Sequence, residues 1–66
     1  MEITLNGQLK SISSISTVAA LVESLGYAGK RIAVERNGEI VPKSTYSSTP
    51  VTQGDQIEID VAVGGG

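Results

Sequence analysis

Two Asn-Gly pairs, Asn6-Gly7 and Asn37-Gly38, constrain this chain more than any other local feature. The first pair follows a run in which apolar and polar residues alternate, Met1 to Leu5, and the second follows the strand-like run Ile32 to Arg36. Asn-Gly between alternating runs is a strong hairpin signal, because both residues tolerate the positive φ that a tight hairpin turn needs. The sequence therefore predicts two β-hairpins.

The strand register of the first hairpin depends on the length of its loop. A three-residue loop over residues 5–7 places Ile3 opposite Leu9 and Glu2 opposite Lys10. This pairing sets apolar against apolar and acid against base, so it is the predicted register. A two-residue loop is the alternative, and it leaves Leu9 facing a polar residue of the first strand.

One helix is predicted between the hairpins. Apolar residues follow helical spacing at Val18, Leu21, Val22 and Leu25. Ser16 or Thr17 provides a hydroxyl suited to capping the first turn, and Gly26 is suited to ending the helix. A helix this short is not stable alone in water, and it must therefore pack on the sheet.

Three further strands are predicted at residues 32–36, 39–41 and 56–61. In the last strand, apolar residues alternate with Glu58 and Asp60, which indicates one buried and one exposed face. The predicted fold class is α+β, a mixed sheet of four to five strands packed on one helix. Residues 1–62 are expected to form this domain, and residues 63–66 a flexible glycine tail.

The composition excludes several kinds of chemistry. The 66 residues contain no Cys and no His, which removes disulfides, thiolate nucleophiles and the usual general base. The net charge of −2 argues against a nucleic-acid partner. No signal peptide or membrane-spanning segment is recognisable, so a cytoplasmic setting is expected. We also expect no catalytic residue, no bound metal and no bound cofactor.

The sequence closes on Gly64-Gly65-Gly66. A frayed or artificially added end is one interpretation of such a run. The other is that the carboxylate of Gly66 is the reacting group, since a strip without Cβ atoms can thread a narrow active-site channel of a partner. A free carboxylate is a poor electrophile, so a partner must first activate it, and joining it to AMP from ATP would supply a good leaving group. A sulfur nucleophile could then displace AMP and leave a thiocarboxylate.

Three segments together resemble the ThiS family. They are residues 32–43, residues 54–59 and the closing Val63-Gly64-Gly65-Gly66. The resemblance implies the ubiquitin-like β-grasp fold and the role of sulfur carrier in making the thiazole part of thiamin. In that family a ubiquitin-activating-like enzyme adenylates the terminal glycine, here Gly66. A sulfur-relay protein then supplies sulfur, and thiazole synthase takes it from the carrier.

The resemblance further implies that residues 63–65 form the segment that partners bind, and that ATP is used by the activating partner alone. The free chain is expected to be a monomer. The alternatives are a carrier like the small subunit of molybdopterin synthase, a ubiquitin-like modifier of other proteins, and a plain binding module.

Several other side chains have a structural and a functional interpretation. Glu58 and Asp60 are interpreted as solvent-facing, and as a possible partner surface rather than paired catalytic acids. Lys30-Arg31 is interpreted as a solvated turn, with contact to an acidic partner as the alternative. Tyr27 and Tyr46 are expected to pack at the edge of the core.

Overall fold

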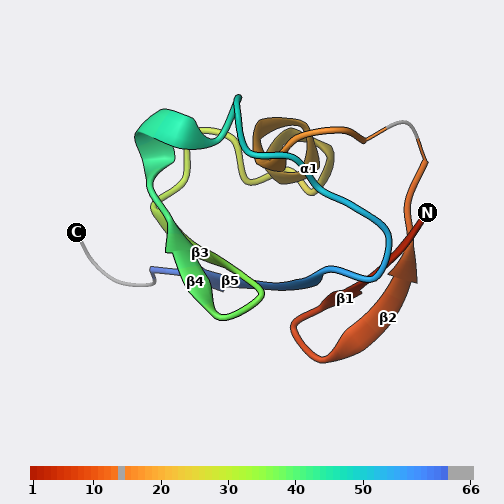
Figure 1. The fold of residues 1–66 in the computed structure, drawn as a ribbon. Helices are drawn as coiled ribbons and strands as arrows, with labels where there is room; N and C mark the ends of the chain where they lie inside the picture. The colour runs from red at the N-terminus through yellow and green to blue at the C-terminus, as the bar shows by residue number, and fades with distance from the viewer. Residues whose placement is uncertain (14, 63–66) are drawn as a thin grey trace.

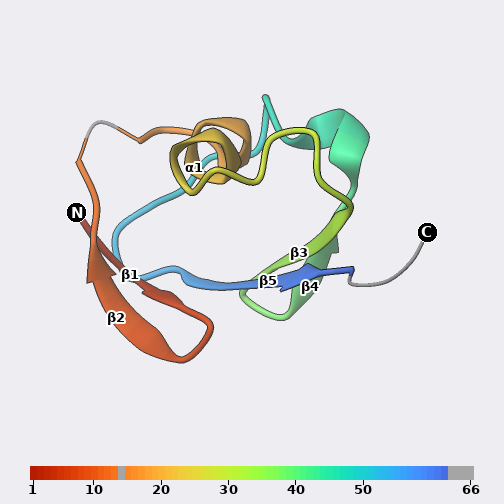
Figure 2. The same ribbon diagram turned by 180° about the vertical axis from the view of Figure 1, so that it is seen from behind.

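The computed structural model describes residues 1–13 and 15–62. Its elements follow the order β1 (Glu2–Leu5), β2 (Gln8–Ser11), α1 (Val18–Ser24), β3 (Ile32–Arg36), β4 (Glu39–Val41), the 3₁₀ turn η1 (Lys43–Thr45) and β5 (Gln56–Val61). In Figure 1 the helix lies above a sheet that curves beneath it, and Figure 2 shows the same two layers from behind. The predicted strands and helix are confirmed.

The five strands form one mixed sheet in the order β2-β1-β5-β3-β4. The last strand, β5, lies in the middle, parallel to β1 and antiparallel to β3. The two hairpins therefore form the outer parts of the sheet, and β5 joins them (Figure 1). The mixed sheet packed on one helix agrees with the predicted fold class.

The predicted register of the first hairpin is wrong. The structure has a two-residue loop, which pairs Leu5 with Gln8, Thr4 with Leu9 and Ile3 with Lys10. Asn6 and Gly7 have φ of 49° and 80°, the left-handed values of the two-residue turn that matches strand twist.

The predicted register assumed that β2 has a buried face to align. Every residue of β2 is exposed, because β2 is the outermost strand. With no burial on β2 to decide the register, the turn decides it. The predicted pairs of Ile3 with Leu9 and of Glu2 with Lys10 are consequently absent.

The helix is stabilised at both ends as the sequence predicts. The Thr17 hydroxyl accepts a hydrogen bond from the Ala20 backbone N–H at 3.2 Å, so Thr17 rather than Ser16 is the N-cap. Gly26 follows the helix with φ of 80°, a value favourable for glycine at a helix end. Buried Val18, Leu21 and Val22 then face the sheet.

A single apolar core fills the space between helix and sheet. It consists of Ile3, Val18, Leu21, Val22, Val34, Val41, Val51, Ile57 and Ile59. Tyr27 and Tyr46 are half-buried against it, as predicted. The segment after η1 also covers the start of α1, since the Tyr46 carbonyl accepts a bond from the Ala19 N–H at 2.9 Å. Among the described residues, no helix is long and apolar enough to cross a membrane.

Candidate functional site

Residues 63–66 follow β5 in the sequence, so the candidate site depends on the hydrogen bonds that hold β5 in the sheet. From Ile57 to Val61, β5 pairs with β3, with Arg36 opposite Ile57 and Ile32 opposite Val61. One residue further, the Ala62 N–H donates to the Arg31 carbonyl at 2.9 Å. The backbone is thus fixed up to Ala62. The predicted reacting residue Gly66 and the predicted partner-binding residues 63–65 lie outside the described residues.

Asn6, in the turn of the first hairpin, holds β5 from the β1 side. Its side-chain oxygen accepts a hydrogen bond from the Ile59 N–H at 2.8 Å, and its side-chain nitrogen donates to the Ile59 carbonyl at 3.2 Å. Its backbone N–H donates to the Ile57 carbonyl at 2.9 Å. The amide side chain therefore continues the hydrogen-bonding edge of β1 past the last residue of that strand.

Asn37, in the turn of the second hairpin, does the same from the β3 side. Its side-chain oxygen accepts from the Gln56 N–H at 2.9 Å, and its backbone N–H donates to the Gln56 carbonyl at 2.7 Å. Both Asn-Gly turns thus have a second role besides reversing the chain, because their asparagines attach β5 to both hairpins.

Asp55 lies just before β5, and its carboxylate accepts hydrogen bonds from several segments of the chain. It is 5% exposed. Its carboxylate accepts from the Arg36 Nε at 2.8 Å, from the Thr52 N–H at 2.8 Å, and from the Asn37 side-chain nitrogen and Thr52 hydroxyl at 3.0 Å each. Burial alone would raise the pKa of Asp55, but these donated bonds outweigh burial and lower the pKa from 3.8 to about 2. The carboxylate is therefore ionised at neutral pH and ties the start of β5 to β3.

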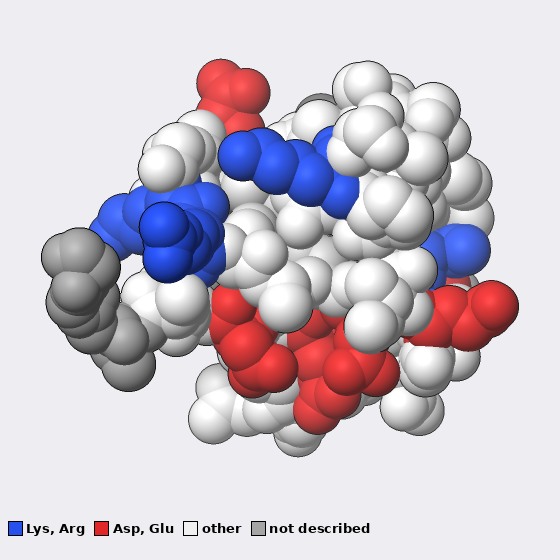
Figure 3. Space-filling model, turned by 90° about the vertical axis from the view of Figure 1, so that its left-hand side faces the viewer, with Lys and Arg blue, Asp and Glu red and all other residues white. Residues whose placement is uncertain are grey.

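The sheet has one face turned away from α1, here called the open face. Glu58 and Asp60 of β5 are exposed on it, as the sequence predicts. Glu35 of β3 lies directly opposite Glu58. Figure 3 shows acidic side chains gathered along the lower part of the molecule, on the side of the sheet. These three residues, Glu35, Glu58 and Asp60, form an acidic strip. Like charges directly opposite each other destabilise a strand pair, so the acidic strip lowers the stability of the fold and is suited to a basic partner surface.

Two large apolar side chains, Leu9 of β2 and Ile40 of β4, also lie on the open face. They are 70% and 76% exposed. The register places Leu9 beside Thr4 and Ile40 beside Glu35, so both share the face of the acidic strip. Both side chains offer apolar area that a partner surface could bury.

Sequence reasoning missed these two residues. The wrong hairpin register placed Leu9 opposite Ile3, on the buried face. The available signal was the Asn-Gly turn itself, which favours a two-residue loop and moves Leu9 to the open face. Ile40 could have been found by alternation from its neighbour Val41, which is buried.

The open face is hollowed between the two hairpins. A hollow of about 270 Å³ lies between the two hairpins and is lined by residues that include Thr4, Glu35 and Glu58. Within residues 1–13 and 15–62, no cluster of three or more His, Cys, Asp or Glu side chains could hold a metal ion.

Comparison with known proteins agrees with this picture of a small sheet-and-helix domain. The ThiS family model matches residues 3–66, a range that includes the closing glycines. A crystal structure of a thiamine biosynthesis protein (ThiS) from Geobacter metallireducens superposes with a TM-score of 0.84. It is 30% identical in sequence, and the match covers all of both chains. The fold is therefore the ubiquitin-like β-grasp, as expected, and the protein is of the small ubiquitin-like class.

The chain belongs to the ThiS family. It is 46% identical over 66 residues to a protein from Paramagnetospirillum magneticum named thiazole synthase, and this match spans all of the chain but 20% of that protein. It is also 32% identical over 66 residues to the uncharacterized protein ycf40 of Porphyra purpurea, of which it covers 93%. The chain thus spans about a fifth of the length of the thiazole synthase that it resembles.

The lowered pKa of Asp55 predicts a specific dependence of stability on pH. Because the folded pKa lies below the unfolded one, the ionised carboxylate stabilises the fold above about pH 5. That contribution is lost as the pH falls toward the folded pKa of about 2. Asp55→Asn should therefore lose about 2 kcal/mol of unfolding free energy near neutral pH, and the difference from the unmodified protein should shrink on acidification.

Urea unfolding at a series of pH values measures this difference. Asp60→Asn is the matched control, since it removes the same charge from an exposed strand position. Equal losses for the two variants at neutral pH would contradict the role assigned to Asp55.

Proposed function

We propose that this protein is a sulfur carrier in which the carboxylate of Gly66 is the reacting group. The observation that carries the proposal is the family match over residues 3–66, which includes the glycine run. The hydrogen bonding of β5 supports it, because this strand is held on both sides up to Ile59 and on the β3 side up to Ala62, which fixes the backbone that precedes residues 63–66. Glycines are suited to entering a partner's active site, since they lack Cβ atoms.

The proposed chemistry takes place on this chain but is performed by its partners. An adenylating enzyme of the ubiquitin-activating kind joins the Gly66 carboxylate to AMP, and ATP loses pyrophosphate. A sulfur-relay protein then supplies the sulfur nucleophile, which attacks the acyl carbon and displaces AMP. The resulting terminal thiocarboxylate donates its sulfur to a thiazole synthase in thiamin biosynthesis. In this proposal the chain is a co-substrate and not an enzyme, and it holds no cofactor of its own.

The relatives support the choice of thiazole as the destination. The thiazole synthase from Paramagnetospirillum magneticum contains a segment 46% identical to this whole chain, within a protein about five times as long. A carrier and its acceptor enzyme that occur in one polypeptide are expected to act on the same step. The Geobacter metallireducens structure, named as a thiamine biosynthesis protein, has the same fold throughout. We further propose that the free carrier is a cytoplasmic monomer.

Intact-mass measurement tests the reacting group. After incubation with ATP, the cognate adenylating enzyme and a sulfur source, the chain should gain the mass of one sulfur-for-oxygen exchange, located by fragmentation at Gly66. A variant that lacks Gly65 and Gly66 should show no gain, because the acceptor carboxylate is displaced. An unchanged mass of the full chain would overturn the proposal. An isopeptide adduct would instead indicate a ubiquitin-like modifier.

The open face is proposed as the surface that docks the adenylating enzyme. Combined Glu58→Lys and Asp60→Lys should weaken binding about tenfold or more, because an attractive acidic strip becomes partly basic. Titration calorimetry with the enzyme measures the effect. Glu39→Lys is the matched control for the single variant Glu58→Lys, since it makes the same charge change at an exposed position off the open face. Equal affinity of these two single variants would count against this docking surface.

A further inference from the structure

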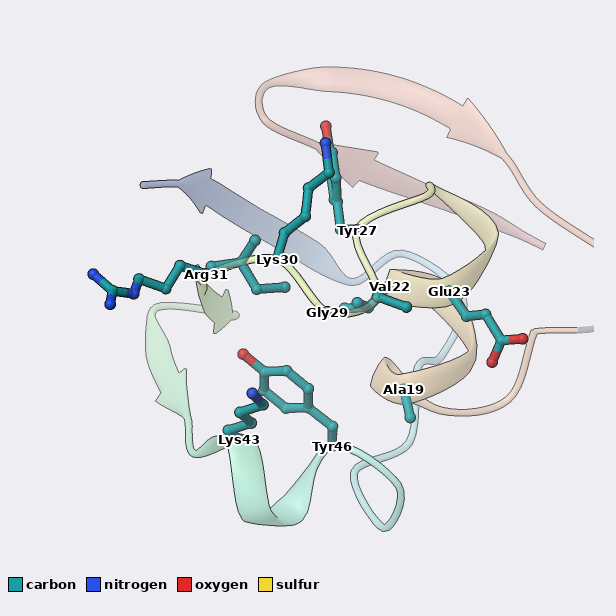
Figure 4. A pocket seen from close by; sticks show the side chains of 11 residues that line it. Ala19, Val22, Glu23, Tyr27, Gly29, Lys30, Arg31, Lys43 and Tyr46 are labelled. Carbon is teal, nitrogen blue, oxygen red and sulfur yellow. The ribbon is translucent and has the colours of Figure 1, made fainter. Parts of the chain in front are cut away.

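A second concave surface lies on the side of the sheet that carries α1. This groove has a volume of about 330 Å³ and lies between α1, the connector that follows it, and η1. Its walls are mainly apolar and include Ala19, Val22, Tyr27, Ile32 and Tyr46. Figure 4 shows the Tyr46 ring and the helix side chains around the hollow. A concave apolar wall of this size accommodates an apolar side chain of a ligand.

The rim of this groove is basic. Lys30, Arg31 and Lys43 all line it, which accounts for three of the five Lys and Arg residues of the chain. Of the other two, Arg36 is paired with Asp55 at 2.8 Å. Glu23 is the one acidic residue among the lining side chains. In a chain of net charge −2, the concentration of cations at one groove gives it a charge opposite to that of the open face.

The arrangement of the cations distinguishes between possible ligands. In Figure 4, Arg31 extends outward from the start of β3, Lys30 points in another direction, and neither points toward Lys43. A compact phosphate group is best bound by donors that converge on one point. Cations spread along a rim are instead suited to carboxylates spaced along an extended chain. The geometry favours an acidic peptide over a phosphate.

We propose that the groove docks an acidic peptide segment of a protein partner. One apolar side chain of the segment enters between Tyr27 and Tyr46, and flanking carboxylates pair with Lys30, Arg31 and Lys43. The groove also lies next to the end of β5, since Arg31 accepts the hydrogen bond of Ala62. A partner bound here is therefore close to the end of β5 and leaves the open face uncovered. The protein can then be held by an acidic and a basic partner surface at the same time.

This inference does not depend on the chemistry of the glycine tail, so the two can fail separately. The test is an NMR titration of the full isotope-labelled chain with a short synthetic peptide in which glutamates surround a single leucine. Amide shifts should move at Ala19, Val22, Lys43, Tyr46 and residues 28–32, and the affinity should fall as salt rises. A peptide with the leucine replaced by serine should bind more weakly, and one with lysines in place of glutamates should not bind the groove.

Charge variants complete the test. Lys30→Glu with Lys43→Glu should weaken peptide binding at least about tenfold, because two attractive pairs become repulsive. Lys10→Glu, a cation of β2 outside the groove, should leave the affinity unchanged. Retained dispersion of the amide spectrum shows that each variant is folded, and Lys30→Gln with Lys43→Gln replaces the double reversal if it is not.

Three results would overturn the proposal. The first is an absence of shifts at the groove, and the second is equal weakening by Lys10→Glu. The third is tighter binding of AMP or inorganic phosphate than of the peptide at the same residues, which would make the groove an anion or nucleotide site.

Discussion

The structure depends on the way two asparagines attach β5 to the rest of the sheet. Asn6 bonds to both backbone groups of Ile59, and Asn37 bonds to both backbone groups of Gln56. These bonds add to a pairing with β3 that runs from Ile57 to Val61, and to a pairing with β1 that covers only Gln56 and Ile57. The strand that leads to residues 63–66 is therefore also the strand that makes one sheet from two hairpins, so the stability of the fold and the position of the candidate site have the same physical basis.

A chain this short has one apolar core, and one face of its sheet is buried in that core. The remaining surface is divided by charge. The open face carries Glu35, Glu58 and Asp60 between two exposed apolar residues, whereas the groove beside α1 carries three cations around an apolar wall. In the proposed function only Gly66 of this chain takes part in bond making. The choice of partner therefore depends on these two surfaces and their opposite charges.

Most of the secondary structure could be predicted because it depends on neighbours in the sequence. The helix with its Thr17 cap and the two Asn-Gly turns are local features. The register of β2 could not be predicted from burial, since β2 buries nothing. The network around Asp55 was also missed, because it joins Arg36, Asn37 and Thr52 only after the sheet has formed.

The functional surfaces could be predicted only in part, because only part of them depends on neighbours in the sequence. Alternation along β5 correctly predicted that Glu58 and Asp60 are exposed. Leu9 was predicted on the wrong face because the register of its strand was wrong. The groove is formed when the β3–β4 hairpin brings Lys43 near Lys30 and Arg31, which no local pattern reveals. The role of Gly66 came from family resemblance together with the absence of His and Cys, rather than from any geometry.

The measurement that tests the central claim most directly is a single-turnover discharge of the carrier. The thiocarboxylate form, labelled with a sulfur isotope, is mixed with a thiazole synthase and its other substrates. The account predicts that the label leaves the protein, whose mass returns to that of the carboxylate, and that it appears in the thiazole product in equal amount. Retention of the label on the chain, or its release without incorporation into thiazole, would contradict the account.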